Sequence, residues 1–245
     1  PMRLLIFGGT TEGRVLARRA GALGAEVTVS VATPLGAEEL AGLDGVRVLT
    51  GRLDQSGMET LLPGFDLCVD ATHPYAAEAT AAIRAACERT GMPLLRLLRP
   101  ASRVEGAVRV PSCRAAAEFL TDRPGNILLA TGAKELSTFG TLDPRRLYVR
   151  VLPAHEGLSA CEAMGIPHSH ILALQGPFSH KLNEAILEQY QIAWLVTKDG
   201  GRAGGFEEKL AAARTVGVRV VLVERPPDEG EGLEEILEKI KERLV

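Results

Sequence analysis

The chain has 245 residues, of which 46% are hydrophobic, enough to bury a sizeable core in one large or two small domains. Its formal net charge of -3 creates no overall positive field, so we expect neither nucleic acid nor a membrane surface as partner. Four scattered cysteines, without a CxxC pair or metal-ligand spacing, favour reduced thiols and no bound metal. The opening run Met2–Phe7 is too short for a signal peptide or a membrane span, so we expect a cytoplasmic protein.

The first hundred residues alternate strand-like and helix-like patterns. Short apolar or β-branched runs predict strands at Arg3–Phe7, Glu26–Ala32, Val46–Thr50, Asp66–Ala71 and Leu94–Leu98, and the clearest helices are Arg14–Leu23 and Ala76–Thr90. Short apolar strands that alternate with helices indicate a parallel sheet with helices on both faces.

The second half repeats this rhythm without repeating the sequence. Predicted strands are Val108–Val110, Asn126–Thr131, Leu147–Val151, Ile171–Leu174, Ala193–Thr197 and Arg219–Val223; predicted helices are Arg114–Leu120, His180–Gln189, Phe206–Val216 and Leu233–Leu244. The alternation breaks at RPASRVEG, around Arg99–Arg103. We therefore expect two α/β lobes, residues 1–99 and residues 100–245, with a cleft between them and a strand order that the pattern does not fix.

A glycine-rich turn follows the first predicted strand and opens the first helix. Ile6–Arg14 reads IFGGTTEGR, in which Gly8 and Gly13 fit GxGxxG while Thr10 replaces the middle glycine and Gly9 is additional. Glycines let the backbone approach a pyrophosphate, and N–H groups at a helix start stabilise its charge. We expect the Thr10 hydroxyl to donate to phosphate. The alternative is a strand-to-helix turn without a ligand.

The end of the second predicted strand bears on the choice of cofactor. Sites for NAD usually place an acidic residue there to hold the ribose 2′-hydroxyl. Here SVATPLG contains Ser30 and Thr33, and the first acidic residues, Glu38 and Glu39, fall in the next predicted helix. A 2′-phosphate would meet no repulsion, so the sequence favours NADPH over NADH, although NADH stays possible.

The segment DATHPYA ends the fourth predicted strand, at the edge where open α/β sheets bind ligands. Pro74 favours an extended His73, so His73 and Tyr75 can project into the cleft. The alternative is a turn in which Asp70 and Thr72 cap the following helix. Close to the lobe boundary, Arg96, Arg99 and Arg103 either bind carboxylates or phosphate or are ordinary surface arginines.

Two loops of the second half suit anion binding. ATGAK, at Ala130–Lys134, follows a strand and is typical of a small anion-binding turn. TKDGGRAGG, at Thr197–Gly205, places four glycines beside Lys198 and Arg202, which favours a flexible anion-closing loop over a plain linker. RVLP, at Arg150–Pro153, and QGPF, at Gln175–Phe178, also end strands but are weak signals.

Taken together, IFGGTTEGR, GRLD, DATHPYA, LRLLRP, ATGAK, RVLP, QGPF and TKDGGRAGG resemble the precorrin-6A reductase family of cobalamin biosynthesis, in order from Leu4 to about Pro226. Many members of that family have Ser where this chain has Gly200, so a role there rests on the backbone. The resemblance implies two Rossmann-like lobes, residues 1–99 binding the dinucleotide and residues 100–245 completing the cleft. It also implies NADPH-dependent reduction of one double bond in precorrin-6A or its cobalt form, a tetrapyrrole rich in carboxylates.

The resemblance also implies roles for individual residues. Tyr75, Arg96 and Arg99 are the expected substrate contacts, and His73 is the tentative proton donor, with solvent as the alternative. The expected cofactor contacts are Gly8, Gly9, Thr10, Thr11, Glu12, Gly13, Ser30, Thr33, Thr131, Gly132, Lys198, Asp199, Gly200 and Gly201.

Two other functions share the glycine turn. A short-chain-type dehydrogenase needs Lys four residues after its catalytic Tyr, and neither Tyr75, Tyr148 nor Tyr190 has one. A non-catalytic NADPH-sensing protein is the second alternative, and the polar strand ends argue against it. Catalytic turnover would separate it from an enzyme.

Overall fold

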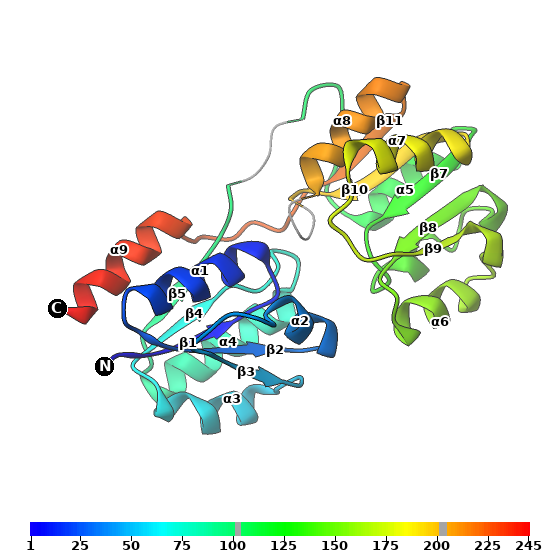
Figure 1. Ribbon diagram of the computed structural model, residues 1–245. Helices are drawn as coiled ribbons and strands as arrows, with labels where there is room; N and C mark the ends of the chain where they lie inside the picture. Colours follow the sequence, from blue (N-terminus) through cyan, green and yellow to red (C-terminus); the bar gives the residue numbers. More distant parts are fainter. Residues whose placement is uncertain (101–103, 201–204) are drawn as a thin grey trace. The chain divides into compact units, whose positions relative to one another are not determined.

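The protein forms two compact units, which the computed structural model describes over residues 1–100, 104–200 and 205–245 (Figure 1). Unit 1 comprises Pro1–Pro100 together with Pro226–Val245, and unit 2 comprises Ala101–Arg225. Each unit contains its own parallel sheet with flanking helices, as the sequence pattern predicts. The fold class, two Rossmann-like α/β lobes, is therefore confirmed.

Unit 1 is built on a five-stranded sheet in the order β3-β2-β1-β4-β5, with every neighbouring pair parallel. Its strands are β1 (Arg3–Phe7), β2 (Glu26–Val31), β3 (Val46–Thr50), β4 (Leu67–Asp70) and β5 (Leu94–Arg96). Its helices are α1 (Thr11–Ala22), α2 (Pro34–Glu39), α3 (Gln55–Leu61), α4 (Ala77–Thr90) and α9 (Leu233–Leu244), and a short 3-10 turn covers Leu62–Gly64.

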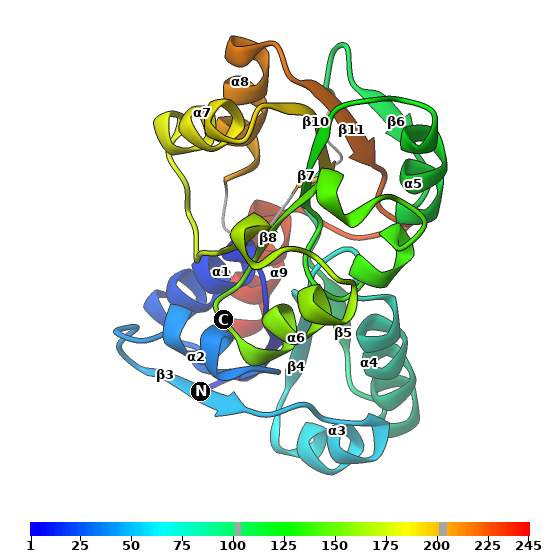
Figure 2. The ribbon, with the colours of Figure 1, turned by 90° about the vertical axis from the view of Figure 1, so that its right-hand side faces the viewer.

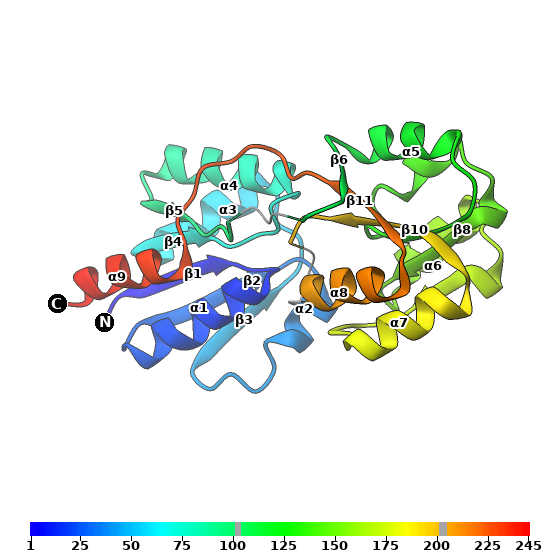
Figure 3. The same cartoon turned by 90° about the horizontal axis from the view of Figure 1, so that it is seen from above.

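The strands of unit 1 are apolar on both faces because both faces are covered. Leu4 and Ile6 of β1 pack in the cluster that α1 and α9 close, whereas Leu5 and Phe7 pack in the cluster that α3 and α4 close. Figure 3 shows these two helix pairs on opposite sides of the sheet. This alternation explains why β1 reads as a continuous apolar run.

The C-terminal segment corrects the expected domain boundary. The sequence pattern predicts residues 226–245 in the second lobe, but they lie in unit 1. Glu231 forms a parallel bridge with Leu97, accepting the N–H of Leu98 and donating to the carbonyl of Arg96. The apolar face of α9 then packs on the sheet with α1. An amphipathic pattern predicts that a helix covers a core but not which of two similar sheets it covers.

Unit 2 is built on a six-stranded parallel sheet in the order β6-β11-β10-β7-β8-β9. Its strands are β6 (Val108–Val110), β7 (Asn126–Ala130), β8 (Leu147–Val151), β9 (Ile171–Ala173), β10 (Ile192–Lys198) and β11 (Arg219–Val223). Its helices are α5 (Cys113–Thr121), α6 (His155–Ala163), α7 (His180–Gln189) and α8 (Phe206–Val216), and 3-10 turns cover Leu136–Phe139, Pro144–Arg146 and His168–His170.

The helices α7 and α8 pack side by side on one face of this second sheet (Figure 2). Figure 3 shows α5 on the opposite face. Every strand predicted from the sequence is present, with ends that differ by no more than two residues. The prediction did not specify α3 and α6. The sequence of α6, HEGLSACEA, contains a glycine and lacks a clear apolar stripe, so its helical pattern is weak.

Each sheet has one place where successive strands are added in opposite directions. In unit 1 this switch point lies between β1 and β4, and in unit 2 it lies between β7 and β10. Open α/β sheets bind ligands outside the carboxyl ends of the strands that flank such a point. The predicted site segments follow these strands: IFGGTTEGR follows β1, DATHPYA follows β4, ATGAK follows β7 and TKDGG follows β10.

Candidate functional site

The glycine turn after β1 brings α1 close to the neighbouring strands. A Cβ on Gly8 would lie 2.8 Å from Cγ1 of Val29, and one on Gly13 would lie 2.9 Å from Cβ of Ala71. A side chain at either position would push the turn or the helix away from the sheet. Gly9 has φ +139, and the space around its missing Cβ is open. The turn therefore packs tightly against the sheet and stays open at Gly9.

Thr10 is the N-cap of α1 and has a different role from the one expected. Its hydroxyl donates to the carbonyl of Ala71 at 2.8 Å and accepts the N–H of Gly13 at 3.1 Å. The hydroxyl proton is therefore engaged within the protein, and direct donation to a phosphate is not favoured. The first N–H groups of a helix lack partners within it. With Gly13 capped, the N–H groups of Thr11 and Glu12 are the ones that a ligand can use.

The end of β2 has no acidic side chain in the structure. Ser30 is buried, and its carbonyl accepts the N–H of Gly8 at 2.9 Å. Thr33 caps α2 by accepting the N–H of Gly36 at 3.1 Å. Glu38 and Glu39 lie in α2, as predicted. No carboxylate therefore comes from the residues that directly follow β2.

The DATHPYA segment folds back on itself at the end of β4. The buried Asp70 accepts the N–H of Thr72 at 3.0 Å and its hydroxyl at 2.6 Å. Nδ1 of His73 accepts the N–H of Tyr75 at 3.3 Å, and the two rings lie 5.2 Å apart. The helix α4 begins after Ala76 without a side-chain cap, so the expected alternative, capping by Asp70 and Thr72, is wrong.

Arg96, an expected substrate contact, is buried beneath this turn. Nη1 of Arg96 donates to the carbonyl of Thr72 at 2.9 Å and to that of Asp70 at 3.1 Å, and it lies 3.4 Å from the Asp70 carboxylate. Its Nε donates to Asp228 at 3.0 Å. Although burial alone would raise the pKa of Asp228, hydrogen bonds from Arg84 and Arg96 hold it below the usual value. These contacts favour a structural role for Arg96, and its contact with substrate stays a prediction.

Arg99, a second expected substrate contact, is far more exposed than Arg96. Its side chain is 46% exposed, and its Nε lies 3.2 Å from the Glu12 carboxylate in the first turn of α1. The structure thus brings together one expected substrate contact and one expected cofactor contact. An exposed guanidinium beside the glycine turn can reach an anionic ligand, whereas the buried Arg96 is held in place.

At the switch point of unit 2, an ion pair joins the two predicted anion-binding loops. Lys198 Nζ lies 2.6 Å from Glu135, which also accepts a hydrogen bond from the Cys113 thiol at 3.5 Å. Burial would raise the pKa of Glu135, but Lys198 holds it below the usual value. Burial raises the pKa of Cys113 to about 12, so the thiol stays a protonated donor. Charged side chains at this switch point are therefore fixed in position.

The remaining predicted residues of unit 2 lie on the same loops. Thr131 is buried, and its Oγ1 lacks a hydrogen-bond partner among the residues that the structure describes. Because buried polar groups are nearly always hydrogen-bonded, this hydroxyl requires a further partner. Gly132 and Gly200 have φ of +83 and +65, which suit glycine. Asp199 is buried. Gly201 lies outside the described residues, as do Arg103 and Arg202.

Two buried cations of unit 2, Arg150 and Lys209, were not among the expected site residues. Arg150 is 9% exposed near the end of β8, and Lys209 is 7% exposed in the first turn of α8. The RVLP motif is a weak sequence signal for Arg150. For Lys209 no sequence signal existed, because a lysine in an amphipathic helix normally faces solvent.

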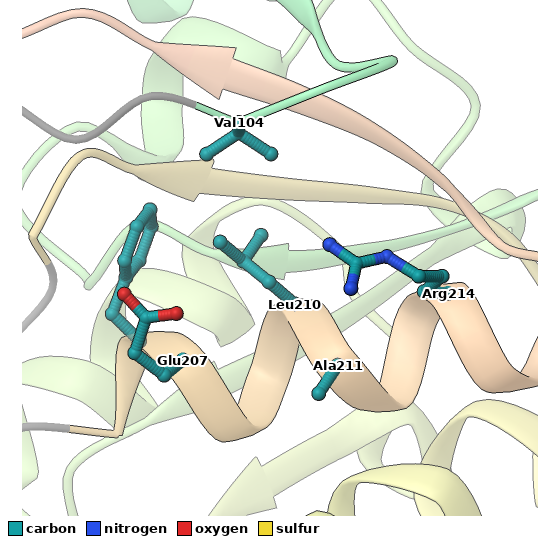
Figure 4. Close-up of a pocket in the computed structure, with 6 residues that line it drawn as sticks. Val104, Glu207, Leu210, Ala211 and Arg214 are labelled. Atoms are coloured by element: carbon teal, nitrogen blue, oxygen red, sulfur yellow. The ribbon is translucent and has the colours of Figure 1, made fainter.

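A small depression lies along α8 in unit 2. It is lined by Val104, Phe206, Glu207, Leu210, Ala211 and Arg214 (Figure 4). None of the expected site residues belongs to this lining. We assign no function to it.

Comparison with known proteins gives a consistent result. A family model described as Precorrin-6x reductase CbiJ/CobK matches residues 3–241. A cobalt-precorrin-6A reductase from Methanothermobacter thermautotrophicus is 37% identical over 238 residues, covering 94% of this chain and 79% of that protein. The chain belongs to the Precorrin-6x reductase CbiJ/CobK family. The resemblance seen in the sequence is thereby confirmed.

Further relatives of this reductase family cover the chain almost fully. A cobalt-precorrin-6A reductase from Priestia megaterium is 32% identical over 250 residues, covering 99% of this chain and 98% of that protein. A solved structure of the CobK precorrin-6A reductase has a TM-score of 0.78 and 28% identity, and the match covers 99% of this chain and 97% of that one. Both units of the chain therefore fall within the family's fold.

All four cysteines are buried free thiols, as the sequence predicts. Within the described residues, no helix has the length and apolar character needed to span a membrane. The same part of the chain contains no group of three or more His, Cys, Asp or Glu side chains that could hold a metal ion.

Proposed function

We propose that this protein uses NADPH to reduce one carbon–carbon double bond of precorrin-6A or cobalt-precorrin-6A. The observation that carries the proposal is that the family match over residues 3–241 coincides with a glycine turn at the switch point of unit 1. The relatives' names supply the substrate, and the turn supplies a reason for a dinucleotide.

The turn fits the pyrophosphate of a dinucleotide. Gly9 leaves its outer side open, Gly13 lets α1 approach β4, and the N–H groups of Thr11 and Glu12 begin the helix. Thr10 acts as a positioning residue, because its hydroxyl ties the start of α1 to Ala71. When bound, NADPH supplies the hydride. A phosphate at the ribose 2′-position meets no repelling carboxylate directly after β2, which favours NADPH over NADH.

His73 is the proposed proton donor to the reduced ring. Its Nδ1 accepts the Tyr75 N–H, so the neutral imidazole carries its proton on Nε2. The contact between the two rings restrains the imidazole. The Asp70–Thr72–Arg96 contacts then hold the backbone from which His73 projects. Solvent is the alternative source of the proton.

The carboxylates of the substrate require positive partners. Arg99 in unit 1 and Lys198 in unit 2 lie at the two switch points, and each is oriented by a carboxylate, Glu12 and Glu135 respectively. A substrate carboxylate can replace the internal one at either place, because Glu12 and Glu135 are partly exposed and water can solvate each of them once it is displaced.

An anaerobic assay of nicotinamide absorbance tests the proposed reaction. We expect NADPH oxidation to start only when precorrin-6A or cobalt-precorrin-6A is added, with one product formed per NADPH consumed. NADH should support a kcat/KM lower by about tenfold or more, because the 2′-phosphate contributes binding energy. If neither tetrapyrrole accelerates NADPH oxidation by folded protein, the reductase proposal fails. NADPH binding without turnover would instead support the NADPH-sensing alternative.

A further inference from the structure

Arg150 and Lys209 are both buried on the side of the second sheet that α7 and α8 cover, where the charge of Arg150 acts on Lys209. Arg150 follows Tyr148 by two residues on β8, so both side chains point to the face where Tyr148 packs against α7. Nη1 of Arg150 donates to Oδ1 of Asn183, on α7, at 2.8 Å. Lys209 belongs to α8, which packs against α7. β8 therefore contacts α7 through this hydrogen bond, and α7 in turn packs against α8.

The partners of these two cations are neutral. The guanidinium of Arg150 lies over the ring of Phe178, 4.3 Å from its centroid, and its hydrogen-bond partner is an amide. The ammonium of Lys209 lies 6.0 Å from the centroid of Phe206. Burial lowers the pKa of Lys209, and the charge of Arg150 adds to this effect, so that the pKa falls to about 7. Burial lowers the pKa of Arg150 to about 10.

No carboxylate compensates either charge. Across the described residues, neither Arg150 nor Lys209 forms an ion pair, and residues 101–103 and 201–204 contain no Asp or Glu in their sequence. Burying an unpaired charge is costly, and two like charges near each other add to the cost. Such an arrangement is retained more readily when a ligand completes it.

We propose that Arg150 and Lys209 form an oxyanion site that binds a carboxylate or phosphate group. One Nη1 contact of Arg150 is used by Asn183, which fixes the guanidinium plane and leaves further N–H donors for a bidentate contact. Lys209 adds a point charge on the same group. Where the oxyanion is a carboxylate of the tetrapyrrole, the inference rests on the proposed function and names how unit 2 recognises that substrate.

Steady-state kinetics and cofactor titration of Lys209→Met test the site and identify the source of the oxyanion. If the site binds a substrate carboxylate, KM for cobalt-precorrin-6A rises about tenfold or more, while the Kd for NADPH is unchanged. If the site binds the ribose 2′-phosphate of the cofactor, the Kd for NADP⁺ rises by a similar factor and the Kd for NAD⁺ does not. Lys181→Met, which removes an exposed lysine on α7, is the matched control and should change neither. Unchanged KM and Kd in Lys209→Met would overturn the proposal.

Thermal unfolding gives a second readout that needs no turnover. In anion-poor buffer Lys209→Met should raise Tm by about 2 °C or more, because a buried unpaired charge is removed. Citrate or inorganic phosphate, compared with chloride at equal ionic strength, should raise the Tm of the unmodified protein and not that of the variant. A lower Tm for Lys209→Met, or equal responses of both proteins to the anions, would contradict the site. If the protein shows no reductase activity but its Tm still responds to the anions as expected, only the proposed reaction is contradicted.

Discussion

Arg96 of unit 1 and Arg150 of unit 2 occupy similar places in the fold but have opposite surroundings. Each is buried near the carboxyl end of a parallel strand. Arg96 contacts two carboxylates, Asp70 and Asp228, and several carbonyls. Arg150 contacts an amide and an aromatic ring, with a second cation close by. The same residue type at the same kind of position is compensated in one unit and uncompensated in the other.

This difference separates a structural cation from a cation that can bind a ligand. In unit 1 the Arg96 contacts join the end of β4 to the returning C-terminal segment, and they fix the turn that carries His73. In unit 2 Arg150 has no carboxylate partner among the described residues, so the unliganded protein bears the desolvation cost of its charge. Charge compensation, rather than burial or residue type, distinguishes the two roles.

Removing Arg96 should have the largest effect on stability. Arg96→Met leaves Asp70 and Asp228 without their shared partner, so we expect the free energy of unfolding to fall by about 3–5 kcal/mol. Urea denaturation followed by circular dichroism measures it. Arg19→Met removes an exposed arginine paired with Glu234 and should leave stability nearly unchanged. If both variants are equally stable, the network does not hold unit 1 together and the comparison with Arg150 loses its basis.

Replacing His73 tests whether the turn that Arg96 supports carries chemistry. His73→Ala should lower kcat by about a hundredfold, because a positioned proton donor contributes roughly 10²–10⁴ in rate. The Kd for NADPH should stay nearly the same, since the glycine turn is untouched. His168→Ala, at an exposed histidine of unit 2, is the control. Unchanged steady-state kinetics for His73→Ala would remove His73 from the site and leave solvent as the proton source.

Much of the fold could be predicted because parallel strands covered on both faces leave a strong apolar signal. Arg3–Phe7 and Asn126–Ala130 are such runs; the prediction matches the first at both ends and extends the second by one residue, to Thr131. Which sheet the last helix covers could not be predicted. Glu231 pairs with Leu97 through the backbone, and backbone pairing leaves no trace in side-chain pattern. Strand order was hidden for the same reason.

Residues of the candidate site could be predicted where a close backbone approach requires glycine or where a loop has a typical composition. Gly13 is required by the close approach of Ala71, and such a requirement shows in the sequence as a motif. Partners far apart in the chain left no such signal. Asp228 could not be recognised as the partner of Arg96, and Lys209 looked like an ordinary surface lysine of an amphipathic helix. Long-range charge compensation is a property of the folded chain.

The pH dependence of stability gives the smallest effect but tests the uncompensated cation directly. In the folded protein the pKa of Lys209 is about 7, whereas an unfolded lysine titrates near roughly 10.4. Between these values the unfolded chain holds more protons, so this group's contribution to the free energy of unfolding rises with pH. The advantage of Lys209→Met over the unmodified protein should therefore shrink by about 1 kcal/mol or more between about pH 6 and pH 9.

Urea denaturation at the two pH values measures this change, with Lys181→Met as a control whose difference from the unmodified protein stays constant. Saturating phosphate or citrate should weaken the pH dependence, because an anion beside Lys209 favours its charged form. If the advantage of Lys209→Met is independent of pH, Lys209 is not a desolvated cation. The contrast between Arg96 and Arg150 would then reflect packing rather than unpaired charge. The proposed oxyanion site in unit 2 would be contradicted.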